Sequence, residues 1–192
     1  RLSGLHHVRF SLSDCRSIRR AVRTMRVYLS ENAFIDLLIS SAEVYRKECF
    51  GFLLGYKLED RFIVEHAFSV QTANRRHKGV EYTRKNHKKI EPILARFNKL
   101  QKIGDFHSHT QFGPTKGLAA PSEEDINSMV HDHIYLIVAI NNNEKTMSWG
   151  ENRDGTISGS VSDFFFKISA HFLNGDASAK RATIHCPFPP GL

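Results

Sequence analysis

The chain has 192 residues, of which 41% are hydrophobic and 24% are charged, a composition that predicts one soluble globular domain with a substantial core. Its three scattered cysteines exclude a disulfide framework and a zinc knuckle built from thiolates, so we expect a reducing compartment such as the cytoplasm. No apolar run approaches the roughly 18 residues of a membrane-spanning helix, and no membrane partner is expected.

The net charge of +7 is concentrated in two basic segments. Residues 1–26 carry seven arginines and one acidic residue, and residues 71–102 carry ten lysines or arginines and two acidic residues. Both segments therefore favour acidic partners, either protein or nucleic acid. The first 24 residues are rich in Arg and Ser, as transit peptides are, but they lack a clear apolar face. We therefore interpret residues 1–24 as a basic N-terminal extension and residues 25–192 as the folded domain.

Patterns typical of strands and helices alternate from residue 25 onwards. Residues 25–29 predict a short strand, and Ser30 is a suitable N-cap for a helix over residues 31–45, whose apolar side chains follow helical spacing. Residues 50–56 and 61–70 are two apolar runs separated by a polar turn, so they predict a β-hairpin.

The middle of the chain combines basic residues with a long loop. Residues 71–80 are polar and predict a loop, after which apolar residues on one face predict a helix over residues 84–102. Pro92 should kink that helix or begin part of it. Residues 103–109 predict a strand, and the glycines and prolines of residues 110–121 predict an extended loop.

The C-terminal part is again mixed in pattern. Residues 122–132 predict a helix, and residues 134–140 predict a buried strand. Two further strands are expected at residues 145–151 and 156–161, and the Phe-rich residues 164–173 predict a helix. Because helices and strands alternate along the whole chain, the predicted fold class is mixed α/β.

Three short motifs contain the candidate chemistry. His107 and His109 are two residues apart on a predicted strand, so both imidazoles point the same way and can reach one metal ion. Asp125, in the Ser-Glu-Glu-Asp motif at 122–125, would supply a third, oxygen ligand, although Ser-x-x-Asp is also close to a helix capping box. Glu48 opens an apolar strand, where it is either a general base beside a metal-activated water or an exposed residue at a helix end.

Taken together, ECFGFLLG, HSH and SEED occur in the order found in the JAMM family of zinc metalloproteases, also called MPN+ or JAB, and the chain resembles that family over residues 25–151. The resemblance implies a curved mixed β-sheet flanked by helices, similar to the cytidine-deaminase architecture. It also implies one Zn²⁺ per chain. The residues and roles that it implies are His107, His109 and Asp125 as zinc ligands, Glu48 as general base and Ser122 as the hydrogen-bond donor to the oxyanion.

The chain departs from the family pattern in two places. Thr110 follows the second histidine, where the family commonly has Pro, and the loop over residues 110–121 is longer than usual. Asp105 stands where the family often has an aromatic residue. Since longer loops cost little free energy, we expect the ligand geometry to survive. The loop is then either a lid beside the zinc or a surface insertion.

The resemblance implies an activity and a class of partner. Family members hydrolyse the isopeptide or peptide bond after the C-terminus of a ubiquitin-like or sulfur-carrier protein, using a zinc-activated water. We expect the basic segment 71–102 to dock the acidic body of such a substrate. Two alternatives remain open, namely a non-catalytic MPN scaffold that binds partner proteins in a complex and a hydrolase of small peptides.

Two further functions fit the sequence less well. A nucleic-acid-binding module would use the basic residues on phosphates, but their pattern is also typical of a solvated helix face, so nucleic acid is not an expected partner. A zinc nucleobase deaminase needs His-x-Glu and Pro-Cys-x-x-Cys motifs. It is excluded because the chain does not contain these motifs in a workable order.

Overall fold

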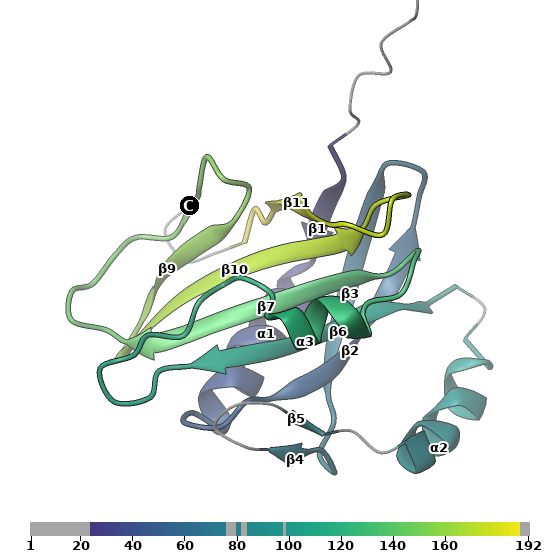
Figure 1. The fold of residues 1–192 in the computed structure, drawn as a ribbon, viewed down its shortest axis with the longest axis horizontal. Coiled ribbons are helices and arrows are strands. Elements are labelled where there is room, and N and C mark those ends of the chain that lie inside the picture. The colour runs from purple at the N-terminus through teal and green to yellow at the C-terminus, as the bar shows by residue number, and fades with distance from the viewer. Residues whose placement is uncertain (1–23, 76–79, 82–83, 98, 189–192) are drawn as a thin grey trace, which may run out of the picture.

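The computed structural model describes residues 24–75, 80–81, 84–97 and 99–188, and one nine-stranded sheet dominates it (Figure 1). The predicted mixed α/β class is confirmed, with more strand and less helix than expected. Among the described residues, no helix combines the length and the apolar character needed to cross a membrane. The elements, in chain order, are β1 (Arg26–Leu29), α1 (Glu31–Glu43), β2 (Phe50–Lys57), β3 (Arg61–Ser69), β4 (Asn74–Arg75), β5 (Val80–Glu81), α2 (Arg84–Leu94), β6 (Gln101–Thr110), α3 (Glu123–Ser128), β7 (Ile134–Asn142), β8 (Gly150–Glu151), β9 (Ile157–Val161), β10 (Phe164–Leu173) and β11 (Ala179–His185).

The sheet closes on itself because strand β11 pairs on both sides. The hydrogen-bonded order is β11-β1-β3-β2-β6-β7-β10-β9-β8, and β11 also pairs with β10. The β11–β1 pair is parallel, whereas the β11–β10 pair is antiparallel. Closure pairs backbone groups that an open edge would expose. Strands from the beginning and the end of the domain therefore lie side by side (Figure 1).

Helix α1 packs against the core face of the sheet. Ser30 caps it as predicted, because the Ser30 Oγ accepts a hydrogen bond from the Ala33 N–H at 3.1 Å. Phe34 meets Trp149 edge to face, with ring centroids 4.9 Å apart. Helix α3 lies over the opposite face of the sheet (Figure 1) and buries none of its residues. The candidate site forms on this opposite face, beneath α3.

The prediction of a helix over residues 164–173 is wrong, because Phe164–Leu173 is strand β10. Phe164, Ile168 and Phe172 recur at every fourth position, a spacing that fits one face of a helix and also one face of a strand. Strand β10 pairs with β7 along one side and with β9 and β11 along the other. Partners far away in the sequence thus decide which of the two patterns forms.

Helix α2 is shorter than predicted. It ends at Leu94, two residues after Pro92, whereas the sequence predicted a helix to residue 102. Pro92 lies inside the helix, where it removes one backbone donor and crowds the preceding turn, so it disturbs the helix that the sequence predicted to be continuous. Residues 101–102 begin strand β6 instead, and they pair with β2.

Smaller differences concern the short elements. Helix α3 ends at Ser128 rather than at residue 132, and within residues 145–151 the strand is confined to Gly150–Glu151. Strand β11 has no counterpart in the sequence prediction. Residues 1–23 of the predicted extension lie outside the described part of the chain. The flanking by helices and the likeness to the cytidine-deaminase architecture stay predictions.

Candidate metal centre

Strand β6 presents two histidines on one face. His107 and His109 alternate with the buried Phe106 and Ser108, as the two-residue period of a strand requires. The Nε2 atoms of the two histidines lie 3.1 Å apart. Their side chains are 14% and 18% exposed, so both rings remain accessible from solvent. The strand therefore directs both imidazoles to one point, as expected from their spacing.

Helix α3 supplies a carboxylate to the same point. Ser122 is its N-cap: the Ser122 Oγ accepts from the Asp125 N–H at 3.1 Å, and the Asp125 Oδ2 accepts from the Ser122 N–H at 2.7 Å. The Asp125 Oδ1 lies 3.3 Å from the His107 Nε2, and its Oδ2 lies 3.6 Å from the His109 Nε2. The capping box and the candidate ligand set thus coexist, and the cap holds the carboxylate in its orientation.

The three side chains have the spacing of a tetrahedral zinc site. Zinc bonds of about 2.0–2.2 Å to N and O at tetrahedral angles place neighbouring ligand atoms roughly 3.3–3.5 Å apart. The three distances among His107, His109 and Asp125 run from 3.1 to 3.6 Å and bracket that value, with the two histidines nearest to different oxygens of the Asp125 carboxylate. Among the described residues, these three form the one group of His, Cys, Asp or Glu side chains close enough to share a metal ion. The residues present therefore fit zinc, and their partial exposure leaves room for water as a fourth ligand.

The electrostatics of the cluster favour a bound cation. Burial raises the pKa of Asp125, but hydrogen bonds from His107 and His109 outweigh burial and hold the pKa of this carboxyl far below its usual range. Burial lowers the pKa of His109, but the Asp125 carboxylate and the Leu118 carbonyl outweigh it and raise that pKa. Both shifts show that positive charge is stabilised here, which is what a metal ion would supply.

Glu48 reaches the cluster from the segment before β2. This residue is 9% exposed, and it lies close enough for its charge to act on His109. The buried Ser108 ties the segment to β6: its Oγ accepts from the Cys49 N–H at 2.9 Å, and its own N–H donates to the Cys49 carbonyl at 3.1 Å. The strand that holds the two histidines therefore also positions Glu48.

An ion pair stands where the family often has an aromatic residue. Asp105 lies 3.0 Å from the Lys102 Nζ, which in turn lies 4.3 Å from the centre of the Phe52 ring. In the register of β2 and β6, Phe52 pairs with Asp105 and Phe50 pairs with His107. Phe50 of β2 therefore pairs with a histidine of the metal cluster, and Phe52 pairs with an acidic residue of the ion pair.

A buried histidine near the cluster was missed by sequence reasoning. His171 on β10 is 4% exposed, and its Nε2 lies 2.9 Å from the Ser169 Oγ. Burial, together with the positive charge of Arg181, lowers the pKa of His171 to about 4, so the ring is neutral at pH 7. Side chains alternate between the two faces of a strand, so a strand at residues 164–173 would have placed Ser169 and His171 on one face. The prediction of a helix there hid this pair.

Comparisons with known proteins bear on the family and the fold of the chain. The model of the family of prokaryotic homologs of the JAB domain matches residues 30–151, a range that contains all five candidate site residues. The solved structure of protein DSY2949 from Desulfitobacterium hafniense has a similar fold, with a TM-score of 0.56 over 83% of this chain and 92% of that chain, at 17% sequence identity. A comparison with curated proteins finds no match. Since the family model spans more than half of the chain, the chain belongs to the prokaryotic JAB-domain family.

Proposed function

We propose that this protein is a zinc-dependent peptidase that hydrolyses the amide bond after the C-terminus of a ubiquitin-like or sulfur-carrier protein. The observation that carries the proposal is the near-tetrahedral spacing of His107, His109 and Asp125, at 3.1 to 3.6 Å. The carboxylate of Glu48 stands close enough to act on His109, and it is not one of the three clustered side chains. Three ligands, an accessible fourth position and a nearby base are the components of a metallopeptidase site.

Each residue of the site has a separate task in this proposal. A zinc ion held by His107, His109 and Asp125 would polarise the scissile carbonyl and make a water molecule more acidic. Glu48 accepts a proton from the attacking water on its carboxylate and returns that proton to the leaving amine. The Ser122 hydroxyl donates to the Asp125 Oδ2 at 2.7 Å. It must therefore turn toward the substrate to stabilise an oxyanion, and we expect that turn when substrate binds.

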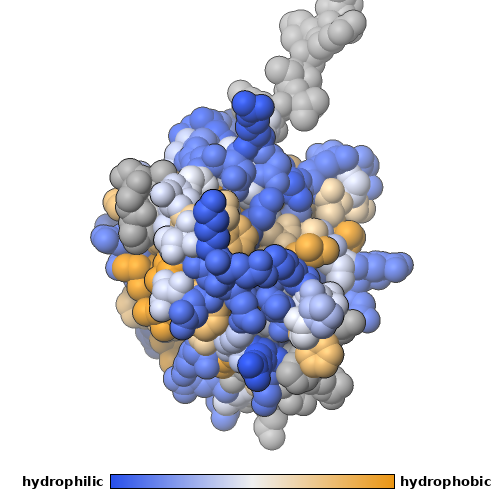
Figure 2. Space-filling model, turned by 90° about the vertical axis from the view of Figure 1, so that its left-hand side faces the viewer, coloured by the Kyte–Doolittle hydropathy of each residue, from blue (hydrophilic) through white to orange (hydrophobic). Residues whose placement is uncertain are grey.

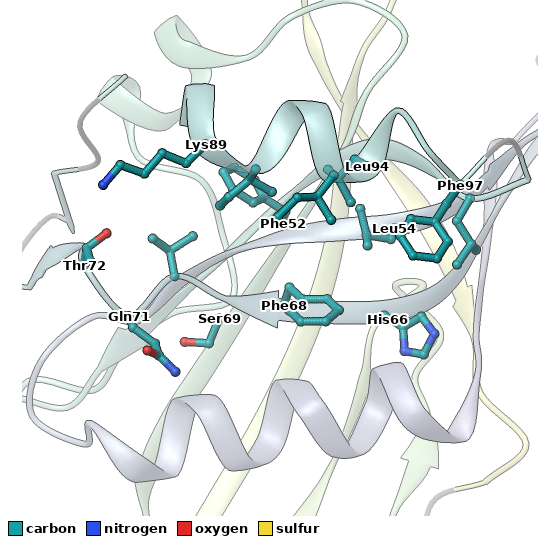
Figure 3. A pocket seen from close by; sticks show the side chains of 14 residues that line it. Phe52, Leu54, His66, Phe68, Ser69, Gln71, Thr72, Lys89, Leu94 and Phe97 are labelled. Atoms are coloured by element: carbon teal, nitrogen blue, oxygen red, sulfur yellow. The ribbon is translucent and has the colours of Figure 1, made fainter. Parts of the chain in front are cut away.

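A long apolar groove supports a protein rather than a small peptide as substrate. The face of the molecule in Figure 2 is mainly hydrophilic, and its hydrophobic patches are separate from one another. By contrast, a groove of about 770 Å³ runs between α2 and strands β2 and β3 (Figure 3). Phe68, Ile93 and Phe97 line it and are each more than half exposed. A continuous apolar surface of this kind is typical of an interaction site.

The position and charge of the groove fit the proposed substrate. Phe52 lines the groove. It lies two residues after Phe50 on the same face of β2, and Phe50 pairs with His107. A protein docked there would lie within reach of the metal cluster. Lys88 and Lys89 are exposed on α2, and Lys89 lines the groove (Figure 3). The rim therefore attracts an acidic protein body while the apolar floor binds its hydrophobic surface.

A pair of matched substrates tests the proposed function. The first is an acidic ubiquitin-like protein whose C-terminal Gly-Gly is joined by an amide to a fluorescent amine, and the second is its last five residues with the same amine. We expect the zinc-loaded protein to cleave the first with a kcat/KM at least roughly 10-fold higher, because binding far from the scissile bond contributes to catalysis. Equal values would indicate a hydrolase of small peptides. Cleavage of neither substrate by protein that contains zinc would indicate the scaffold alternative.

Reversing the charge on the rim should weaken substrate binding alone. In the double variant Lys88→Glu with Lys89→Glu, we expect KM to rise roughly 5- to 10-fold, because two attractions are replaced by two repulsions. We expect kcat to stay within about two-fold, since these residues do not touch the reacting atoms. The double variant Arg153→Glu with Lys180→Glu is the control, because both residues are exposed and lie outside the groove. Equal KM values for both variants would contradict docking at this rim.

A further inference from the structure

The long loop after strand β6 is fastened to strand β7 by one side chain. Asn141 is 5% exposed and makes two hydrogen bonds to Gly117 of the loop. Its Oδ1 accepts from the Gly117 N–H at 2.8 Å, and its Nδ2 donates to the Gly117 carbonyl at 3.1 Å. A backbone N–H can only donate and a carbonyl can only accept, so the orientation of the amide is fixed by its partners. The Asn141 amide thus pairs with both backbone groups of Gly117, as the backbone of a neighbouring strand would.

The next residue of the loop contacts a candidate metal ligand. The Leu118 carbonyl oxygen lies 2.8 Å from the His109 Nδ1. Because a carbonyl oxygen only accepts, the Nδ1 carries the proton of this hydrogen bond. In the neutral ring the Nε2 is then left as the acceptor, and it points toward His107 and Asp125. The loop therefore selects the tautomer of His109 that can bind a metal.

We propose that Asn141 is a positioning residue for the metal centre, acting through Gly117 and Leu118 to fix the tautomer and the orientation of His109. The inference rests on the proposed zinc site and extends it to the loop over residues 110–121. Each residue in this connection is either bonded to the next in the chain or hydrogen-bonded to it. Asn141 is hydrogen-bonded to Gly117, Gly117 precedes Leu118, and the Leu118 carbonyl accepts a hydrogen bond from the His109 ring. In this proposal the long loop over residues 110–121 places the Leu118 carbonyl against the His109 ring.

The packing around Gly117 leaves the loop little freedom. A Cβ atom at this position would collide with the carbonyl oxygen of His109, so the loop backbone lies directly against strand β6. Ala119 is buried at 8% exposure, on the other side of Leu118. The entrance of the loop is fastened too, because the Asn142 N–H donates to the Gln111 Oε1 at 3.1 Å. One neighbour of Leu118 is hydrogen-bonded and the other is buried, which restricts where its carbonyl can lie.

The tautomer of His109 in metal-free protein gives the most direct test. We expect long-range ¹H–¹⁵N spectra of the wild type, recorded at a pH where the ring is neutral, to show the proton on Nδ1. In Asn141→Ala the loop is released, and we expect both tautomers in exchange. Asn142→Ala is the matched control, because it removes a hydrogen bond from the Tyr45 hydroxyl at 2.6 Å and leaves Gly117 untouched. A single Nδ1–H tautomer in all three proteins would overturn the proposal.

Zinc affinity, measured by competition with a chromophoric chelator, is the second measurement. We expect Asn141→Ala to bind zinc roughly 10- to 100-fold more weakly than Asn142→Ala, the usual effect of losing a partner behind a metal ligand. Gly117→Ala, which displaces the loop through its backbone, should weaken binding similarly and covers the case in which Asn141→Ala does not fold. Equal affinity in the two loop variants and the control would overturn the inference. A wild type that binds no zinc but shows the fixed tautomer would reject the proposed function and leave the positioning role intact.

Discussion

Zinc is expected at about one ion per chain in the wild-type protein and at almost none in His107→Ala or Asp125→Asn. Each variant removes one of three ligands, so the loss of affinity should exceed the roughly 100-fold effect of removing a partner behind a ligand. Asp125→Asn keeps a side-chain oxygen for the capping box, but it removes the negative charge and replaces the other carboxylate oxygen by an amide nitrogen that cannot bind a cation. The measurement is the metal content of purified protein after dialysis against a weak chelator.

An exposed histidine outside the cluster provides the control for this experiment. His131→Ala removes an imidazole that lies close in sequence but is not among the three clustered side chains. It should therefore retain the zinc content of the wild type. Zinc retained in His107→Ala would place the metal elsewhere and contradict the site. A wild type that takes up no zinc even after reconstitution would favour the scaffold alternative.

Replacing Glu48 by Gln should abolish hydrolysis and leave the metal in place. The amide is nearly the same size as the carboxylate, but it cannot accept a proton from water at neutral pH. A positioned general base typically contributes 10²- to 10⁴-fold to the rate, and we expect kcat to fall by about that factor. Since Glu48 is not one of the three clustered ligands, the zinc content should stay at about one per chain. Assays of kcat and metal content on the same preparation separate these two effects.

The matched control for Glu48 is a carboxylate on the preceding helix. Glu43→Gln makes the same change of charge at the exposed end of α1 and should leave kcat unchanged. Loss of both zinc and activity in Glu48→Gln would mean that Glu48 supports the metal rather than the proton transfer. Full activity in Glu48→Gln would remove it from the mechanism, and another group would have to be the base.

The site is held together by hydrogen bonds from three separate directions. Ser108 connects the Glu48 segment to β6, the capping box of α3 holds Asp125, and the loop carbonyl of Leu118 holds His109. Catalytic groups must be held close to their productive geometry, and side chains with such supports lose little further entropy when metal binds. The arrangement therefore has the preorganisation that the proposed chemistry requires.

The sequence by itself determined the parts of the site that depend on local geometry. The period of a strand places His107 and His109 on one face wherever that strand lies, and the Ser122 cap orients Asp125 within its own helix turn. The two strands of the β2–β3 hairpin and the cap of α1 at Ser30 follow from equally local rules, and the structure has them as predicted. These interactions join residues in the same element or in two strands that follow directly on one another, so their patterns are visible without a fold.

Only the tertiary structure decided which distant segments meet. The sheet closes through β11 and its partners, which no local pattern identifies. The strand at residues 164–173 depends in the same way on its neighbours, because the spacing of Phe164 and Ile168 suits a helix equally well. The same holds for Asn141 and Gly117, which are 24 positions apart, and for the groove between α2 and the sheet. A periodic pattern reports which side of an element is apolar, whereas the choice of partner depends on the free energy of the whole packed chain.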